Sequence, residues 1–320
     1  MPALFLAVLM LMGVADEGHA QLRTASTPLH IVVPLAAGSG PDLLARTLSE
    51  GLREKIGRTV IVENRPGAGE RLGAEYVAKS APDGSTILLA PGGGLVVSPF
   101  LVSSLPYDAT QFAPISLLTR GHLVLVARPG LEAASLVDVV SLARAKPGAL
   151  TYGSSGIGTP PHLTGELLRL AAGVEMTHVP YKGGLAPAMT DLLAGHIDLL
   201  FANLVNALEH MRAGRLKVIA VASQARASEL PDVPTIAESY PTVHALSWFA
   251  ALAPPKTGRR VTDELSSAFR EILLSPQVSL SLRTAGLEPV ASSPDDMAAF
   301  MAEERERWKK VIESANIKPE

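Results

Sequence analysis

The sequence predicts an α/β protein built from two lobes, and two observations support this fold class. Short apolar segments alternate with helical patterns along most of the chain after residue 21, and such alternation produces parallel sheets covered by helices. The chain has 320 residues, of which 47% are hydrophobic and 18% are charged. This composition is globular, and at this length a single core stops growing, so we expect two lobes.

The first twenty residues differ from the rest of the chain. Residues 3–14 form a continuous apolar run, which is too short to span a bilayer but long enough for the core of a signal peptide. Gly18 and Ala20 supply small residues before a cleavage site at Gln21, although no Lys or Arg precedes Arg23. A buried N-terminal strand or helix is the alternative. We expect residues 1–20 to be a signal peptide, and an exported chain without cysteine indicates a bacterial periplasm.

The remaining elements follow in order from hydrophobic patterns and helix start signals. Strands are expected over residues 30–35, 59–62, 85–89, 123–127, 150–152, 199–201 and 217–222. Helices are expected over residues 41–55, 68–79, 136–145, 160–172, 186–194 and 294–314. Thr159 and Ser293 are the expected N-caps of two of these helices, each followed by proline. An apolar stripe predicts that the last helix packs against a core.

Two proline-rich segments suggest where the lobes meet, at residues 112–115 and 231–241. If the chain leaves the first lobe near residue 120 and returns near residue 240, two crossing strands form a hinge. We therefore expect a discontinuous lobe one over 21–121 and 241–320, and a lobe two over 122–240.

A glycine-rich turn joins the first strand to the first helix, with Gly38, Ser39 and Gly40 directly before Pro41. The first backbone N–H groups of a helix have no intrahelical acceptor and lie at the positive end of its dipole. Such a turn can bind an anion without a charged side chain. It can also be a simple reversal of the chain, in which Asp42 satisfies the same donors. Both interpretations remain open from this loop alone.

A second turn repeats the same pattern at Tyr152–His162, where a strand, a glycine- and hydroxyl-rich loop and a proline-started helix follow one another. Ser154, Ser155 and Thr159 add hydroxyl groups to it. Two such loops, one in each expected lobe, favour anion binding more strongly than either loop does alone.

Two further glycine loops are weaker evidence for a binding site. Gly67, Gly69 and Gly73 resemble a dinucleotide fingerprint, which would make the protein a nucleotide-dependent oxidoreductase. Residues 63–66 separate this loop from the preceding strand, however, whereas the fingerprint begins at the strand end. Gly92, Gly93 and Gly94 follow another strand and suit either a cleft or a bare turn.

The motifs of common enzymes are missing from the sequence. A hydrolase using Ser155 with His162 is a third reading, but no G-x-S-x-G elbow surrounds Ser155 and no H-E-x-x-H occurs. The absence of cysteine excludes thiolate metal sites and disulfides. A formal charge of −3 gives no reason to expect nucleic acid. We expect no catalytic residue, no metal and no cofactor.

Six longer stretches carry a resemblance to a known family. They are "IVVPLAAGSGPDLLAR", "VIVENRPGAGERLGAEYVAKSAPDGSTILL", "LPYDATQFAPISLL", "TYGSSGIGTPPHLTGELL", "THVPYKGGLAPAMTDLLAGHIDLLF" and "SELPDVPTIAES". In this order they resemble the tripartite tricarboxylate transporter receptors, the Bug-type periplasmic solute receptors. The resemblance implies a type II periplasmic-binding-protein fold, with two α/β lobes that are joined by a two-stranded hinge and close on a carboxylated ligand. It covers nearly all of residues 29–255.

The resemblance also implies the ligand, the partners and the site. The ligand would be a di- or tricarboxylate, an acidic amino acid or an aromatic acid, delivered by a monomer to membrane transporter subunits or to a sensor domain. The ligand-binding residues carried over are Ala37, Gly38, Ser39, Gly40 and Asp42 in lobe one, Ser154, Ser155, Gly156, Gly158 and Thr159 in lobe two, and, near the cleft, Asn64, Tyr181, Lys182 and Asp198. The sequence departs from the family at Pro41, Glu70, Ser85 and residues 92–95, and these departures bear on which ligand fits.

Overall fold

The computed structural model describes residues 27–181 and 184–317. The predicted signal peptide and Lys182 therefore lie outside the described residues. Among the helices of the described ranges, none combines the length and the apolar character needed to cross a membrane.

The first sheet carries three parallel strands, β1 (Leu29–Val33), β2 (Val60–Asn64) and β3 (Thr86–Pro91), in the order β2-β1-β3. Strand β9 (Leu246–Ala253) continues this sheet antiparallel to β3. Helices α2 (Gly40–Ile56) and α9 (Arg259–Leu273) share one hydrophobic cluster with one face of this sheet. Helices α3 (Arg71–Ala78) and α11 (Pro294–Ser314) contribute to the cluster on the other face. The sheet is therefore covered on both sides, as parallel strands require.

The second sheet is built from β5 (Thr151–Ser154), β6 (Thr177–Pro180), β7 (Leu199–Asn203) and β8 (Lys217–Val221). Strands β5, β6 and β7 are parallel, and helices cover both faces. The helices α5 (Leu136–Ala145) and α6 (Pro160–Ala172) pack on one face, and α7 (Leu185–Ala194) and α8 (Leu204–Arg212) on the other.

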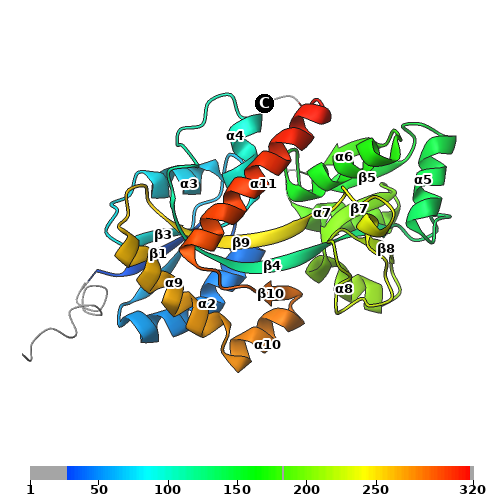
Figure 1. Ribbon diagram of the computed structural model, residues 1–320. Helices are drawn as coiled ribbons and strands as arrows, with labels where there is room; N and C mark the ends of the chain where they lie inside the picture. The colour runs from blue at the N-terminus through cyan, green and yellow to red at the C-terminus, as the bar shows by residue number, and fades with distance from the viewer. Residues whose placement is uncertain (1–26, 182–183, 318–320) are drawn as a thin grey trace, which may run out of the picture.

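One long strand, β4 (Ala113–Ala127), belongs to both sheets (Figure 1). Its first part pairs with β9 and with β10 (Leu287–Pro289), and its second part pairs with β7 and β8. The expected strand over 123–127 is only the second part. The proline-rich segment 112–115 lies at the start of this strand, because β4 begins at Ala113. Pro114 is tolerated beside a shift in register before Ser116. The two-lobed α/β fold is confirmed, whereas the lobe boundaries stay a prediction.

Several elements have no counterpart in the sequence prediction. They are the π-helix η1 (Gly93–Val97), α4 (Ser98–Leu101), β6, α8, the 3-10 helix η2 (Ile236–Glu238), β9, α9, α10 (Pro276–Thr284) and β10. Ser293 caps α11 as expected, since its side chain accepts a hydrogen bond from the N–H of Asp296. Thr159 does not act in this way, because its hydroxyl donates to the carbonyl oxygen of Gly156 instead.

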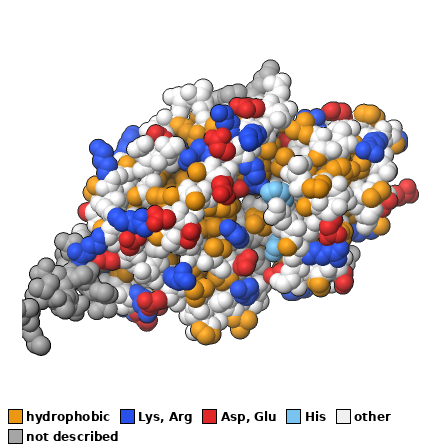
Figure 2. Space-filling model, viewed as in Figure 1, with side chains coloured by type: hydrophobic (Ala, Val, Ile, Leu, Met, Phe, Trp, Pro, Cys, Tyr) orange, Lys and Arg blue, Asp and Glu red, His pale blue; other side chains and the backbone are white. Residues whose placement is uncertain are grey.

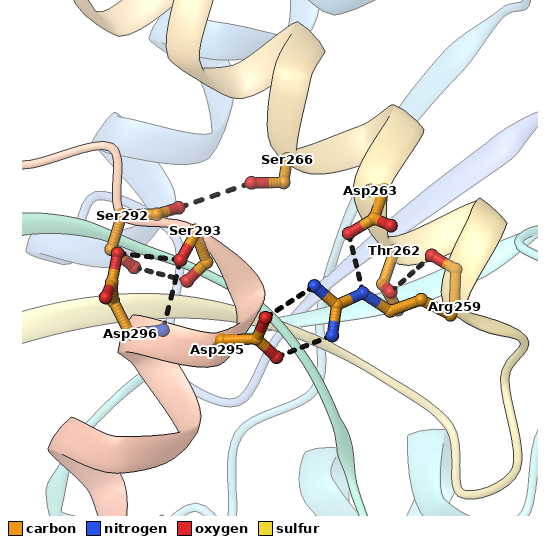
Figure 3. A network of polar contacts seen from close by, with 8 residues as sticks. All are labelled: Arg259, Thr262, Asp263, Ser266, Ser292, Ser293, Asp295 and Asp296. Carbon is orange, nitrogen blue, oxygen red and sulfur yellow. Dashed lines mark hydrogen bonds and ion pairs between the residues drawn. The ribbon is translucent and has the colours of Figure 1, made fainter.

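Helix α11 crosses in front of β4 and β9 and ends beside the second lobe (Figure 1). Its beginning is tied to α9 by Arg259, which donates to both carboxylate oxygens of Asp295 and to Asp263 (Figure 3). Further along, the buried Glu304 accepts hydrogen bonds from the indole N–H groups of Trp248 (3.2 Å) and Trp308 (3.1 Å). Because Trp248 lies on β9, Glu304 fastens α11 to one of the two strands that join the lobes.

Candidate functional site

The loop between β1 and α2 presents backbone donors at a helix N-terminus. Ser39 is the N-cap residue with an extended backbone, but its side chain makes no capping bond. Its hydroxyl oxygen is buried and has no partner among the described residues. In the same ranges, no backbone or side-chain group accepts from the N–H groups of Gly40 and Asp42. These groups are available to an anion at the positive end of α2.

The buried side chain of Asp42 stabilises this loop through hydrogen bonds. It is 1% exposed, and its Oδ2 accepts the backbone N–H of Gly38 at 2.8 Å and the Nε of Arg46 at 3.1 Å. Burial opposes its ionisation, but the hydrogen bonds from Arg46 and Gly38 lower the pKa of its carboxyl below the usual value. The sequence left open whether an anion or Asp42 accepts the backbone N–H groups of this turn. Asp42 accepts only the N–H of Gly38.

Asn64 joins the same arrangement from the end of β2. Its Nδ2 donates to the carbonyl oxygen of Leu35 at 3.0 Å, and its Oδ1 accepts from Arg46 at 3.2 Å. Asn64 therefore fixes the backbone at Leu35, where the loop that contains Ala37 begins. The structure brings the lobe-one residues of the predicted site together.

The loop after β5 is more enclosed. Ser154 is fully buried, and its hydroxyl lies 2.7 Å from Nε2 of His178 and bonds to both the N–H and the carbonyl oxygen of Gly156. Gly156 has φ +125°, a conformation that essentially only glycine adopts. The half-buried Ser155 is different, because neither its hydroxyl nor its N–H has a partner within residues 27–181 and 184–317. Ser155 is the free polar group of this loop.

Three stacked aromatic rings pack against the second loop. His178 lies between Tyr152 and His162, with ring centroids 4.9 Å and 4.0 Å apart. Nδ1 of His162 accepts the N–H of Gly158 at 3.1 Å. Burial lowers the pKa of His162 to about 4, and burial together with the neighbouring His162 lowers the pKa of His178 to about 4. Both rings are neutral at pH 7.

The contact between Ser154 and His178 was not found from the sequence, because the two residues are 24 positions apart. The parallel pairing of β5 with β6 brings them together, since Tyr152 stands opposite His178 in the register. The pair is not an accessible nucleophile, because Ser154 has no exposed surface. The hydrolase reading gains no support either, since Nδ1 of His162 is engaged by Gly158 rather than by Ser155.

Two residues expected near the cleft have other positions. The hydroxyl of Tyr181 donates to Asp191 at 2.6 Å, although its backbone N–H bonds to Ser154 at the edge of the second loop. Asp198 does not lie beside the second loop. Its carboxylate accepts from Arg128 and from the N–H and hydroxyl of Thr151, at the amino end of β5 and β7, whereas Ser154 lies at the carboxyl end. Asp198 thus stabilises the amino ends of β5 and β7, opposite the end of the sheet where Ser154 lies.

The second loop also touches lobe one. A Cβ atom added to Gly158, which has φ +75°, would collide with Leu101 of α4. On another side, Gly286 before β10 packs against the backbone of Val205 in α8. The lobes therefore also meet outside the strands β4 and β9, including at these two contacts.

The face shown in Figure 2 carries basic and acidic side chains side by side rather than a region of one sign. Among the residues that the structure describes, there is no group of three His, Asp or Glu side chains placed to hold a metal ion. Gly67 and Gly69 lie between β2 and α3, and Gly73 lies in the first turn of α3. The space beside Gly67 is filled by Leu72, at 2.6 Å from a Cβ position. The oxidoreductase alternative receives no support.

Comparison with known proteins identifies similar chains over nearly the whole length. The family model "Tripartite tricarboxylate transporter family receptor" matches residues 44–317. Protein BugT of Bordetella pertussis is 35% identical over 312 residues, which cover 95% of this chain and 95% of that protein. Rpa4515 of R. palustris, solved with adipate, has a TM-score of 0.84 at 34% identity, over 92% of this chain and 99% of that one. MatC from Rhodopseudomonas palustris, with bound malate, has a TM-score of 0.79 at 29% identity, over 89% and 99% of the two chains.

Proposed function

Because this chain belongs to the tripartite tricarboxylate transporter receptor family, we propose that it captures a small carboxylated organic anion between its two lobes. The protein is a periplasmic solute-binding receptor with the two-lobed α/β fold of that family. Its role is binding and delivery rather than catalysis, and the acceptor is a membrane transporter or a sensor domain. A monomer exported by residues 1–20 would perform this role.

The observation that carries the proposal is the set of unpaired donors at the start of α2. The N–H groups of Gly40 and Asp42 and the buried hydroxyl of Ser39 have no partners within the described ranges. Asp42 and the hydroxyl of Ser39 are buried, whereas Gly40 is exposed. Because buried polar groups are nearly always paired in folded proteins, the Ser39 hydroxyl is expected to receive a ligand atom. A carboxylate oxygen satisfies these donors without any basic side chain.

The lobe-two contribution comes from the loop over residues 154–159. In this proposal the free hydroxyl and N–H of Ser155 contact the anion, while Ser154, Gly156, Gly158 and Thr159 hold the loop in shape through their hydrogen bonds. Tyr181 is attached to the loop through its backbone. Lobe one (21–121 and 241–320) and lobe two (122–240) turn relative to each other about β4 and β9.

Mass spectrometry of the small molecules that co-purify with the protein tests this function, together with thermal shifts against a panel of acids. Adipate and malate are suitable first probes, because structures of related proteins contain them. At a hundredfold excess over Kd, a ligand stabilises the folded state by about 2.7 kcal/mol, which raises Tm by several degrees. A protein that neither carries nor responds to any organic acid does not have this function.

A further inference from the structure

Glu70 has an unusual backbone for a glutamate. It is the N-cap residue of α3 and has φ +75°, in the left-handed region. This conformation is strained for an L-amino acid, whereas glycine adopts it freely. A strained residue of this kind persists where its side chain has a role that glycine cannot fill, so the side chain is the feature to explain.

The carboxyl of Glu70 lies across the carboxyl end of β1. Its Oε2 accepts the N–H of Gly94 at 3.1 Å, which links the connection after β2 to the helix η1 after β3. Because β1 lies between β2 and β3 in the sheet, this bond passes over the end of β1, where the first candidate loop begins. Gly73, at the start of the same helix, packs directly on Pro34. Ligands of open α/β sheets bind outside the carboxyl ends of the strands.

The same region faces the second lobe. Gly93, the neighbour of Gly94, has Pro160 as the nearest atom outside its own loop, 3.9 Å from its Cβ position. Pro160 directly follows Thr159 and begins α6. Glu70 is therefore bonded to a segment of lobe one that approaches the start of α6, directly after the second candidate loop.

The side chain of Glu70 is half-buried, and its carboxyl contacts the backbone of Gly94. Burial raises the pKa of Glu70 to about 8. The hydroxyl of Tyr107 donates to the carbonyl oxygen of Gly94 at 3.3 Å and is itself neutral, since burial and then the nearby Glu70 raise its pKa to about 12. Arg71 and Glu75 of α3 are further charged side chains close to the Tyr107 hydroxyl. Because Oε2 accepts from Gly94, the proton of the acid resides on Oε1, which has no partner among the described residues.

We propose that Glu70 is a specificity-determining residue, whose Oε1–H donates to an oxygen of the anion remote from the carboxylate that the two loops hold. It selects acids with a second carboxylate or a hydroxyl over simple monocarboxylates. This inference rests on the proposed function, because it concerns the same cleft. It also explains why Gly94 lacks a side chain, since a Cβ there would lie 2.8 Å from Oε2 of Glu70.

Calorimetric titration with malate, adipate and butyrate at pH 7 and pH 9 tests the proposal. With a pKa of about 8, the protonated fraction of Glu70 falls about tenfold between these pH values, so the wild-type Kd for malate or adipate rises about tenfold. Glu70→Gln keeps an N–H donor that does not titrate, and its Kd stays constant. Glu70→Gly, which suits the backbone, loses affinity for malate and adipate but not for butyrate. The matched control Glu75→Gln, on the same helix, behaves as the wild type does.

The inference is overturned if the wild type binds malate and adipate equally well at both pH values, or if Glu70→Gln shows the same pH dependence as the wild type. In either case binding itself persists and the proposed function stands. If the wild type binds no organic acid at pH 7, the proposed function fails together with this inference.

Discussion

The imidazole ring of His162 lies on that of His178, with centroids 4.0 Å apart and an interplanar angle of 27°. Two protonated rings cannot remain at this distance without strong repulsion, and Nδ1 of His162 must stay unprotonated to accept the N–H of Gly158. The stack therefore makes the second binding loop sensitive to acid.

The first prediction follows from these two histidines. Their pKa values are about 4 in the folded state, below the usual 6.5, so between these limits the unfolded chain binds more protons than the folded one. Stability is complete above about pH 6.5 and is lost as the pH falls towards 4. His162→Gln removes one titrating ring and reduces this pH dependence of Tm. Identical pH profiles of the wild type and His162→Gln would contradict this.

The second prediction concerns Glu304. Glu304→Ala leaves two indole N–H groups without an acceptor and breaks the ion pair with Arg307 (2.7 Å). The loss of a buried group with several partners costs about 3–5 kcal/mol, which urea denaturation measures directly. Glu303→Ala, at an exposed position of the same helix, changes stability by about 0.5 kcal/mol or less. Equal effects of the two variants would show that Glu304 does not fasten α11 to β9.

The third prediction concerns movement of the lobes. Opening about β4 and β9 breaks the contacts of Gly158 with Leu101 and of Gly286 with Val205, and a ligand between the lobes holds them closed. Saturating malate or adipate should therefore lower the radius of gyration in small-angle scattering. An unchanged profile under conditions where calorimetry shows full binding would mean that the lobes do not move.

Local signals predicted part of the fold well. Helices α5 and α6 have the expected bounds, because a serine cap or a pair of prolines marks their starts. Strand β9 was missed, because most of its residues are buried on both faces, and an uninterrupted apolar run has no period that separates a strand from a helix. Only the second part of the long strand β4 was predicted, because its first part also lacks an alternation of buried and exposed residues.

In the site, the two glycine loops were found because their residues are consecutive in the sequence. The contacts of Ser154 with His178 and of Glu70 with Gly94 each join residues 24 positions apart, and single-sequence patterns do not report such pairs. The position of Asp198 away from the second loop follows from a local signal. This residue directly precedes a predicted strand, which places it at the amino end of the sheet, opposite the loops that follow the strands.

Calorimetric titration of paired loop variants tests the central claim, that both loops hold one carboxylate. Gly40→Asp and Ser155→Asp each place a carboxylate where the ligand's would lie. Neither position has a positive φ that would strain the new side chain, and the Phe249 ring, 3.1 Å from a Cβ position at Gly40, must shift by a few tenths of an ångström. Gly38 and Gly156 are less suitable, because both have positive φ. We predict that the wild type binds malate or adipate, that each variant binds at least about tenfold more weakly, a loss of about 1.4 kcal/mol, and that Ser141→Asp on the exposed face of α5 matches the wild type. Wild-type affinity in both loop variants would contradict the account.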